Sequence, residues 1–169
     1  GISLVFVLTV LVLALTLGGS VSLGAAKAEY TLKFAHESPP SNARHKAALY
    51  FAEQVEKNTD GRVKVVVYHS GQLGGERQLI EALTVGGIDF VVAGAGMYAA
   101  YAPALELIEM PYLFPNYERA HAVIDGPIGQ KLTAPLLQHN IRVLAFWENG
   151  FRHITNNVRP INTPDDLKG

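Results

Sequence analysis

Residues 62–77 read RVKVVVYHSGQLGGER, and this stretch decides the fold that we expect. Its first part, Arg62–Tyr68, is rich in β-branched residues, which favours a strand. The glycine-rich part, His69–Gly75, has the composition of a turn. An amphipathic helix is then predicted over Glu76–Val85. A strand that passes through a short turn into a helix is one step of an α/β fold.

The segments on either side of this stretch repeat the same pattern. Tyr30–Ala35 alternates apolar and polar residues, which predicts a strand. Ser41 or Asn42 then caps a predicted helix, which ends at Asp60-Gly61. Ile88–Ala93 is almost wholly apolar, as is typical of a strand that is buried on both faces of a parallel sheet. Right-handed crossovers would place helices on both sides of this sheet, so we predict an α/β fold with a mostly parallel sheet.

The regular alternation of strands and helices ends after the third predicted strand. Two amphipathic helices are predicted, over Tyr117–Ile124 and Ile128–His139, and Ile141–Trp147 is predicted to be a fourth strand. Glu148–Gly150 predicts a sharp break, and a last helix is expected to begin at Pro164.

The first residues have the character of a membrane segment. Ile2–Leu23 contains no charged residue, and Ala26-Lys27-Ala28 matches the small-residue pattern that signal peptidase cleaves. We expect an exported, periplasmic protein that is cleaved after about Ala28. An uncleaved anchor is the alternative, since about 20 apolar residues can span a bilayer. Because the sequence stops at the start of a helix, we expect an N-terminal fragment of a longer protein.

Composition excludes several classes of function. The chain has no cysteine, which excludes disulfide scaffolds, thiol catalysis and thiolate zinc sites. Fourteen Lys and Arg stand against 15 Asp and Glu, so no basic excess is available to bind nucleic acid. The six histidines include no pair at a spacing of three or four residues, and we expect neither a metal nor a cofactor.

One segment favours an enzyme. Gly94–Ala99 reads GAGMYA, a G-x-G-x-x-A pattern directly after a predicted strand, where a dinucleotide could bind. The pattern normally follows the first strand of its fold and opens a long helix, whereas Pro103 follows here almost at once. A nucleotide-dependent enzyme therefore remains one alternative. A secreted domain with a structural or protein-binding role is another.

Arg152 is the best candidate for binding a ligand. It follows the break at Glu148–Gly150, just beyond the fourth predicted strand. Open α/β sheets bind ligands at the carboxyl ends of their strands, and the planar guanidinium matches a carboxylate with two hydrogen bonds. An ordinary ion pair, with Glu148 or with an acid elsewhere in the protein, is the alternative.

Four separate motifs resemble the dicarboxylate-binding solute receptors of tripartite ATP-independent periplasmic (TRAP) transporters. The resemblance spans residues 29–169, and its most specific part is Gly150–Asn156 with the segment that follows. The motifs that carry it are Leu32–Ala35, Tyr68–Arg77, Gly87–Phe90, and Gly150–Asn156 followed by Pro160-Ile161 and Asp165–Gly169.

The resemblance implies a periplasmic-binding-protein fold with two α/β lobes that close over a small organic acid. We expect a signal peptide at 1–28, a first lobe at 29–149, and a hinge crossing with the start of a truncated second lobe at 150–169. Arg152 resembles one of two arginines that hold the carboxylate, and the second would lie just beyond Gly169. Other positions that the resemblance assigns to the cleft or hinge are Glu37, Glu76, Gly94, Met97 and Asn149. His36 is a further candidate, because it lies where the carboxyl end of the first predicted strand opens toward a crevice.

These expectations combine into one function. The protein would capture a small carboxylate, either a C4-dicarboxylate or a sugar acid, and deliver it to the small and large permease subunits of a TRAP transporter. No catalysis is expected. The resemblance implies a charged or polar residue at the position of Gly94 in several members of the family, so Gly94 is a departure that bears on which ligand is selected.

Overall fold

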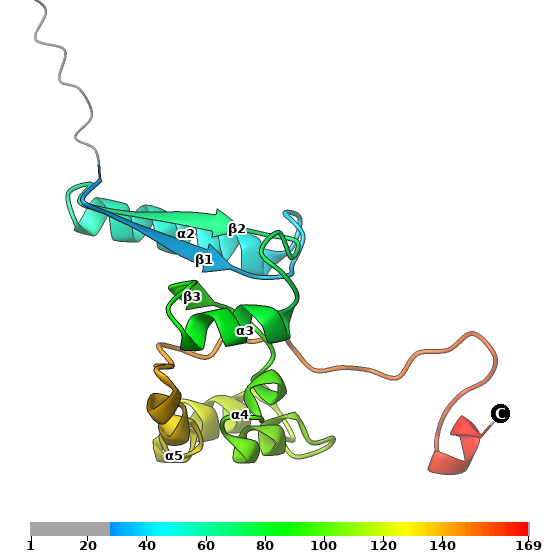
Figure 1. Cartoon of the computed structure of the whole chain (residues 1–169). Coiled ribbons are helices and arrows are strands. Elements are labelled where there is room, and N and C mark those ends of the chain that lie inside the picture. The colour runs from blue at the N-terminus through cyan, green and yellow to red at the C-terminus, as the bar shows by residue number, and fades with distance from the viewer. Residues whose placement is uncertain (1–27, 169) are drawn as a thin grey trace, which may run out of the picture. The chain divides into compact units, whose positions relative to one another are not determined.

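The computed structural model describes residues 28–168 (Figure 1). The expected signal peptide therefore lies outside the described residues, apart from Ala28. Between Ala28 and Lys168 no helix is long and apolar enough to cross a membrane. The described residues form two compact units, which divide between Ala93 and Gly94. The domain boundary that we expect after Asn149 stays a prediction.

The first unit is built on three parallel strands in the order β2-β1-β3. They are β1 (Tyr30–Ala35), β2 (Val63–Tyr68) and β3 (Phe90–Val91). Leu32 is paired with Val65, and Phe34 with Phe90. The parallel sheet that we expected from the sequence is confirmed.

The third strand is shorter than the predicted range, Ile88–Ala93. Its ladder with β1 has only two residue pairs because β1 itself ends at Ala35. Backbone hydrogen bonds continue on both sides of this ladder, from Asp89 to Lys33 at 3.2 Å and from Val92 to Ala35 at 3.3 Å. The segment is therefore tied to β1 over more residues than its strand includes.

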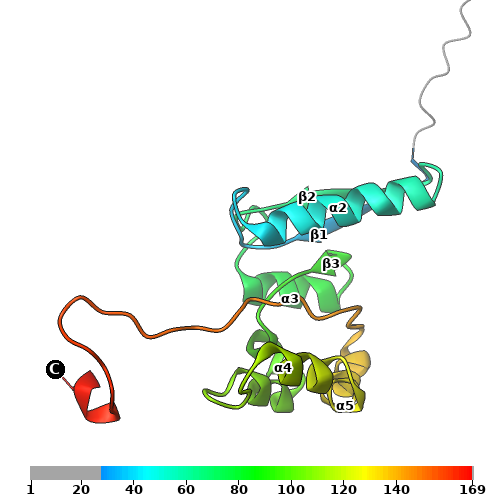
Figure 2. The same cartoon turned by 180° about the vertical axis from the view of Figure 1, so that it is seen from behind.

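Helices cover both faces of the sheet. Figure 1 and Figure 2 show α2 (Ala43–Asn58) lying along one face of β1 and β2. α3 (Glu76–Thr84) packs on the opposite face, and the neighbouring residues Phe34 and Ala35 point to different helices, as the period-two geometry of a strand requires. The α2 face is filled by Leu32, Phe34, Ala48, Phe51, Ala52, Val55, Val65, Val67, Phe90 and Val92, and the α3 face by Ala35, Tyr68, Leu79, Ala82, Ile88 and Val91.

The second unit is made of short helices. They are η1 (Ala95–Tyr98), η2 (Pro103–Glu109), α4 (Tyr117–Ile124), α5 (Pro127–Thr133) and η3 (Ala134–His139), with η4 (Pro164–Leu167) near the end of the chain. The single helix predicted over Ile128–His139 is thus divided at Thr133. Pro135 explains the division, because it has no N–H to donate to the preceding turn and its ring crowds that turn.

The prediction of a fourth strand over Ile141–Trp147 is wrong. These residues form neither a helix nor a strand. A strand needs a neighbouring strand to satisfy its backbone groups, and among residues 28–168 the sheet contains only β2, β1 and β3. Leu144 is accordingly 67% exposed.

Candidate functional site

In the first unit, polar side chains gather at the carboxyl ends of β1 and β2. The loops that follow the two strands are joined by backbone hydrogen bonds from Gly71 to His36 at 3.2 Å and from Ser70 to Ser38 at 3.1 Å. Parallel strands end at the same edge, so residues that are more than 30 positions apart in the sequence meet here. Three of the predicted site residues, His36, Glu37 and Glu76, lie in this group.

Glu37 contacts the beginning of α3. Its Oε1 accepts a hydrogen bond of 2.9 Å from the backbone N–H of Glu76. The first N–H groups of a helix have no partner inside the helix, and their end of the helix dipole attracts negative charge. The α3 N-cap is Gly75, which has no side chain to do this work. Glu37 therefore supplies the cap from another loop.

Glu76 is held from a second direction. Its Oε1 lies 3.7 Å from Nη1 of Arg44, and the two side chains are 17% and 20% exposed. Arg44 is placed by the start of α2, where Oδ1 of Asn42 accepts a hydrogen bond of 2.8 Å from its backbone N–H. Sequence reasoning missed Arg44, because no periodicity connects it to a partner 32 residues away.

His36 is fully buried beneath this group. Its Nε2 lies 3.2 Å from Nδ1 of His45, which is also buried. Burial is the main cause that lowers the pKa of His36 from its ordinary value of 6.5, and the charges of His45, Arg44 and His69 lower this pKa further. His36 thus supports the loop from inside, whereas its place at the end of the first strand had predicted a position facing the crevice.

In the second unit, Gly94 and Met97 belong to the short helix η1. Gly94 is its N-cap, and Met97 is 41% exposed. The neighbouring Gly96 donates its N–H to Oε1 of Glu109 at 2.8 Å. Sequence reasoning missed this role of Glu109.

The same contact argues against a dinucleotide at Gly94–Ala99. A pyrophosphate would need the backbone N–H groups of the turn and the N-terminus of a long helix. η1 has only four residues, and the carboxylate of Glu109 occupies the N–H of Gly96. A second anion at this N–H would meet a like charge.

Asn149 and Arg152 lie in a segment without regular structure. Both are exposed, and within residues 28–168 the guanidinium of Arg152 has no hydrogen bond or ion pair. The alternative that Arg152 pairs with Glu148 is not supported, because Glu148 lies 2.8 Å from Nε2 of His121. Gly150 and Phe151 lie between Asn149 and Arg152. Gly150 has φ +87°, a value that glycine adopts at little cost. The ring of Phe151 packs edge-on against the ring of Tyr117 in α4.

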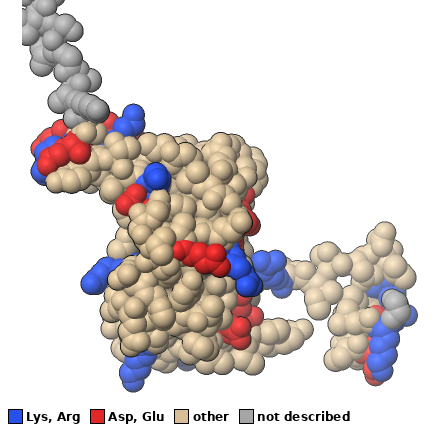
Figure 3. Space-filling view, in the orientation of Figure 1, with Lys and Arg blue, Asp and Glu red and all other residues tan. Residues whose placement is uncertain are grey.

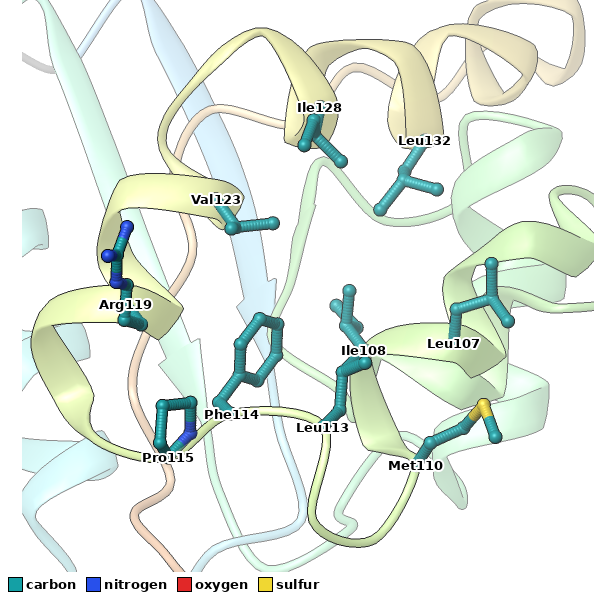
Figure 4. Close-up of a pocket in the computed structure, with 10 residues that line it drawn as sticks. All are labelled: Leu107, Ile108, Met110, Leu113, Phe114, Pro115, Arg119, Val123, Ile128 and Leu132. Carbon is teal, nitrogen blue, oxygen red and sulfur yellow. The ribbon is translucent and has the colours of Figure 1, made fainter.

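The second unit also contains a cavity of about 490 Å³. Figure 4 shows side chains of η2, α4 and α5 facing one another around it. Its lining is apolar apart from Arg119, so a small acid with several polar groups would leave most of them without partners there. The lining residues are Leu107, Ile108, Met110, Leu113, Phe114, Pro115, Arg119, Val123, Ile128 and Leu132.

The described residues contain no group of three His, Cys, Asp or Glu side chains that could hold a metal ion. On the face of the molecule that Figure 3 shows, Lys and Arg side chains are interspersed with Asp and Glu. That face carries no extended basic surface of the kind that binds nucleic acid.

Residues 34–169 match the family of bacterial extracellular solute-binding proteins, family 7 (DctP). The chain belongs to this family. Its relatives in family 7 include the 2,3-diketo-L-gulonate-binding periplasmic protein YiaO of Escherichia coli (strain K12). The two are 34% identical over 142 residues, which are 84% of this chain and 43% of YiaO.

Solved structures agree with this membership. One is a TRAP periplasmic solute-binding protein from Sulfurospirillum deleyianum with bound succinate, with a TM-score of 0.76 and 31% identity over 84% of this chain and 46% of that one. Another is the sugar acid binding protein DctPAm from Advenella mimigardefordensis in complex with galactonate, with a TM-score of 0.78 and 34% identity over 85% of this chain and 46% of that one. The chain thus spans less than half the length of these relatives.

Proposed function

We propose that this chain is part of an extracytoplasmic receptor that captures a small carboxylate and delivers it to the membrane permease of a TRAP transporter. The observation that carries the proposal is the family match over residues 34–169. The relatives differ in their ligands. One is named for binding a keto sugar acid, one holds succinate and one holds galactonate. The ligand class that they share is a small acid, either a dicarboxylate or a sugar acid.

In this proposal the edge at the carboxyl ends of β1 and β2 forms one wall of the ligand cleft. Glu37 and Glu76 would face the ligand there, at the level where open α/β sheets bind small molecules. Their charges favour hydrogen bonds from hydroxyl groups of the ligand over contact with a carboxylate. Gly94 and Met97 would contribute a second, uncharged part of the cleft.

The carboxylate of the ligand would be bound by Arg152. Its exposed guanidinium has donors available for a bidentate pair with a carboxylate. Asn149 would belong to the hinge crossing, and residues 150–169 to the start of a second lobe. A second arginine, beyond Gly169, would complete the clamp. Closing two lobes over the ligand would exclude water and strengthen each of these contacts.

In this proposal the protein acts in the periplasm, and the relative YiaO is named as a periplasmic protein. Cleavage after Ala28 and binding to small and large permease subunits belong to the same proposal. The family is one of solute-binding proteins, and neither a catalytic residue nor a cofactor is needed for the role.

A thermal-shift screen of the complete receptor tests the proposal. Dicarboxylates, sugar acids, neutral sugars and nucleotides would be added separately, since a ligand that binds the native state raises the unfolding temperature. At least one acid should raise it, and the matching neutral sugar should not. Stabilisation by a nucleotide alone would support the enzyme alternative, and no stabilisation by any small molecule would favour a structural or protein-binding domain.

A further inference from the structure

Three histidine side chains form a continuous row in the first unit. His36 follows β1, His45 belongs to the first turn of α2, and His69 follows β2. The ring centres of His36 and His45 are 5.3 Å apart, and those of His45 and His69 are 5.0 Å apart. The row continues to Ser70, whose Oγ lies 2.9 Å from Nδ1 of His69.

The hydrogen bond between His36 and His45 allows one proton between the two facing ring nitrogens. Their facing nitrogens, Nε2 and Nδ1, are 3.2 Å apart, and one hydrogen bond between them needs one proton. If both rings were cationic, two N–H groups would face each other inside the protein. Both side chains are buried, at 0% and 8% exposure, so water cannot separate these charges.

The row is connected to the residues that we propose for the cleft. His36 precedes Glu37, which caps α3 through the backbone N–H of Glu76. His45 follows Arg44, whose guanidinium lies 3.7 Å from Glu76. A change in the row would therefore move both glutamates, because each is held through a neighbour of one of the histidines.

We propose that His36, His45 and His69 are positioning residues that hold Glu37 and Glu76 in place only while the His36–His45 pair carries a single bridging proton. A proton on each of the two facing nitrogens would separate the two rings, release the loop after β1 and weaken ligand capture. The part of this inference that concerns ligand capture rests on the proposed function. The part that concerns the loop does not.

The charges that face His36 favour its neutral form. From α2 the nearest cation is Arg44, and from the β2 loop it is His69, and both lower the pKa of His36 in addition to the effect of burial. Glu76 of α3 lies 3.7 Å from the guanidinium of Arg44, and Oε1 of Glu37 accepts a hydrogen bond from the first turn of α3. His36 therefore lies among charges that disfavour its cationic form.

The sign of the pH effect follows from this direction. In the unfolded chain His36 has the ordinary pKa of 6.5, so between that pH and the lowered pKa the unfolded state binds more protons than the folded state. The contribution of neutral His36 to the free energy of unfolding is fully present above pH 6.5, and it is lost as the pH falls through this window. The unfolding equilibrium constant should increase by up to about tenfold for each pH unit and each proton.

Urea denaturation of the complete receptor without ligand, at several values between pH 8 and pH 5, tests the loop part of the inference. The pH dependence of wild type should exceed that of His36→Gln, whose amide can hold the bond to His45 but does not titrate. His139→Gln is the matched control, because His139 is an exposed histidine on η3. An equal pH dependence in wild type and His36→Gln would overturn the inference.

A second variant keeps the test informative if His36→Gln does not fold. His45→Asn places an amide near the position of Nδ1 and removes the charge that His45 exerts on His36, so the pH dependence of stability should be smaller than in wild type, although the effect of burial on His36 remains. If it leaves the slope at the wild-type value, the inference is wrong.

Titration with the acid found in the screen completes the test. The affinity of wild type should fall from pH 8 to pH 5.5 by more than that of His36→Gln. If no acid binds even at pH 8, the proposed function fails while the stability result still stands. If an acid binds with the same pH dependence in both proteins, the link between the histidine row and the ligand is refuted.

Discussion

The carboxylate of Glu37 accepts a hydrogen bond of 2.9 Å from the backbone N–H of Glu76, 39 residues further along the chain. This contact joins the loop after β1 to the first turn of α3. It also brings two acidic residues to the same edge of the sheet. Gly75, the N-cap of α3, leaves room for this arrangement, because a Cβ atom there would lie 3.2 Å from Oε1 of Glu37.

Glu37→Ala should destabilise the protein by about 1 kcal/mol, the usual cost of losing a helix cap. Glu37→Gln should cost less, since the amide oxygen still accepts the bond but no longer interacts as a charge with the helix dipole. Urea denaturation of both variants measures these effects. Equal stability of Glu37→Ala and wild type would mean that the cap contributes nothing.

Gly96→Ala should break the contact between η1 and Glu109. A Cβ atom at Gly96 would come within 2.7 Å of Oε2 of Glu109, so the carboxylate must move and its hydrogen bond is lost. We expect a loss of about 1 kcal/mol in the free energy of unfolding.

A double-mutant cycle with Glu109→Ala checks the cause of this loss. In the Glu109→Ala background the same Gly96→Ala change should cost much less, because the clashing group is gone. An equal cost in both backgrounds would assign the effect to the backbone of η1 and not to Glu109.

The sequence predicts the first unit better than the second. β1 occupies the predicted range, Tyr30–Ala35, because its residues alternate and each face meets a helix. Asn42 caps α2 as predicted. In contrast, Ile141–Trp147 has the composition of a strand, but a strand also needs a neighbour, which composition does not reveal.

The contacts of the candidate site were harder to foresee. Arg44 with Glu76, and Gly96 with Glu109, are pairs that only the folded chain brings together. Motifs identified the glutamates and glycines as candidates, but they gave no information on the partners. The buried pair of His36 and His45 was missed for the same reason, since nine residues separate two rings that come together only when α2 packs on β1.

Asp166 should titrate below its ordinary pKa of 3.8, because the backbone N–H groups of Asn162 and Thr163 and the Thr163 hydroxyl donate to its carboxylate. The stabilisation of this turn is present above pH 3.8 and is lost as the pH falls through the lowered pKa. Nuclear magnetic resonance titration of the carboxyl carbon measures the midpoint. Thr163→Ala should raise it, and a wild-type midpoint at or above 3.8 would contradict the assignment.

Arg152→Lys should weaken acid binding by the complete receptor while leaving its fold intact. Lysine keeps the charge but loses the planar fork that binds a carboxylate with two hydrogen bonds. Loss of a buried charged contact costs about 2 to 5 kcal/mol, which corresponds to well over a tenfold change in affinity. Arg159→Lys is the matched control, since Arg159 already donates to the backbone carbonyls of Asp166 and Lys168. An unchanged affinity for Arg152→Lys would remove Arg152 from the proposed clamp.

Isothermal titration calorimetry of the complete receptor tests the central claim most directly. The acid that stabilises the protein in the screen is compared with its own amide, which has nearly the same shape but no negative charge. We predict binding of one acid per receptor with micromolar or tighter affinity, and an affinity for the amide that is at least about a hundredfold lower, as expected when a charged hydrogen-bonding partner is lost. Equal binding of acid and amide, or binding of neither, would contradict the claim that this protein is a receptor for a small carboxylate.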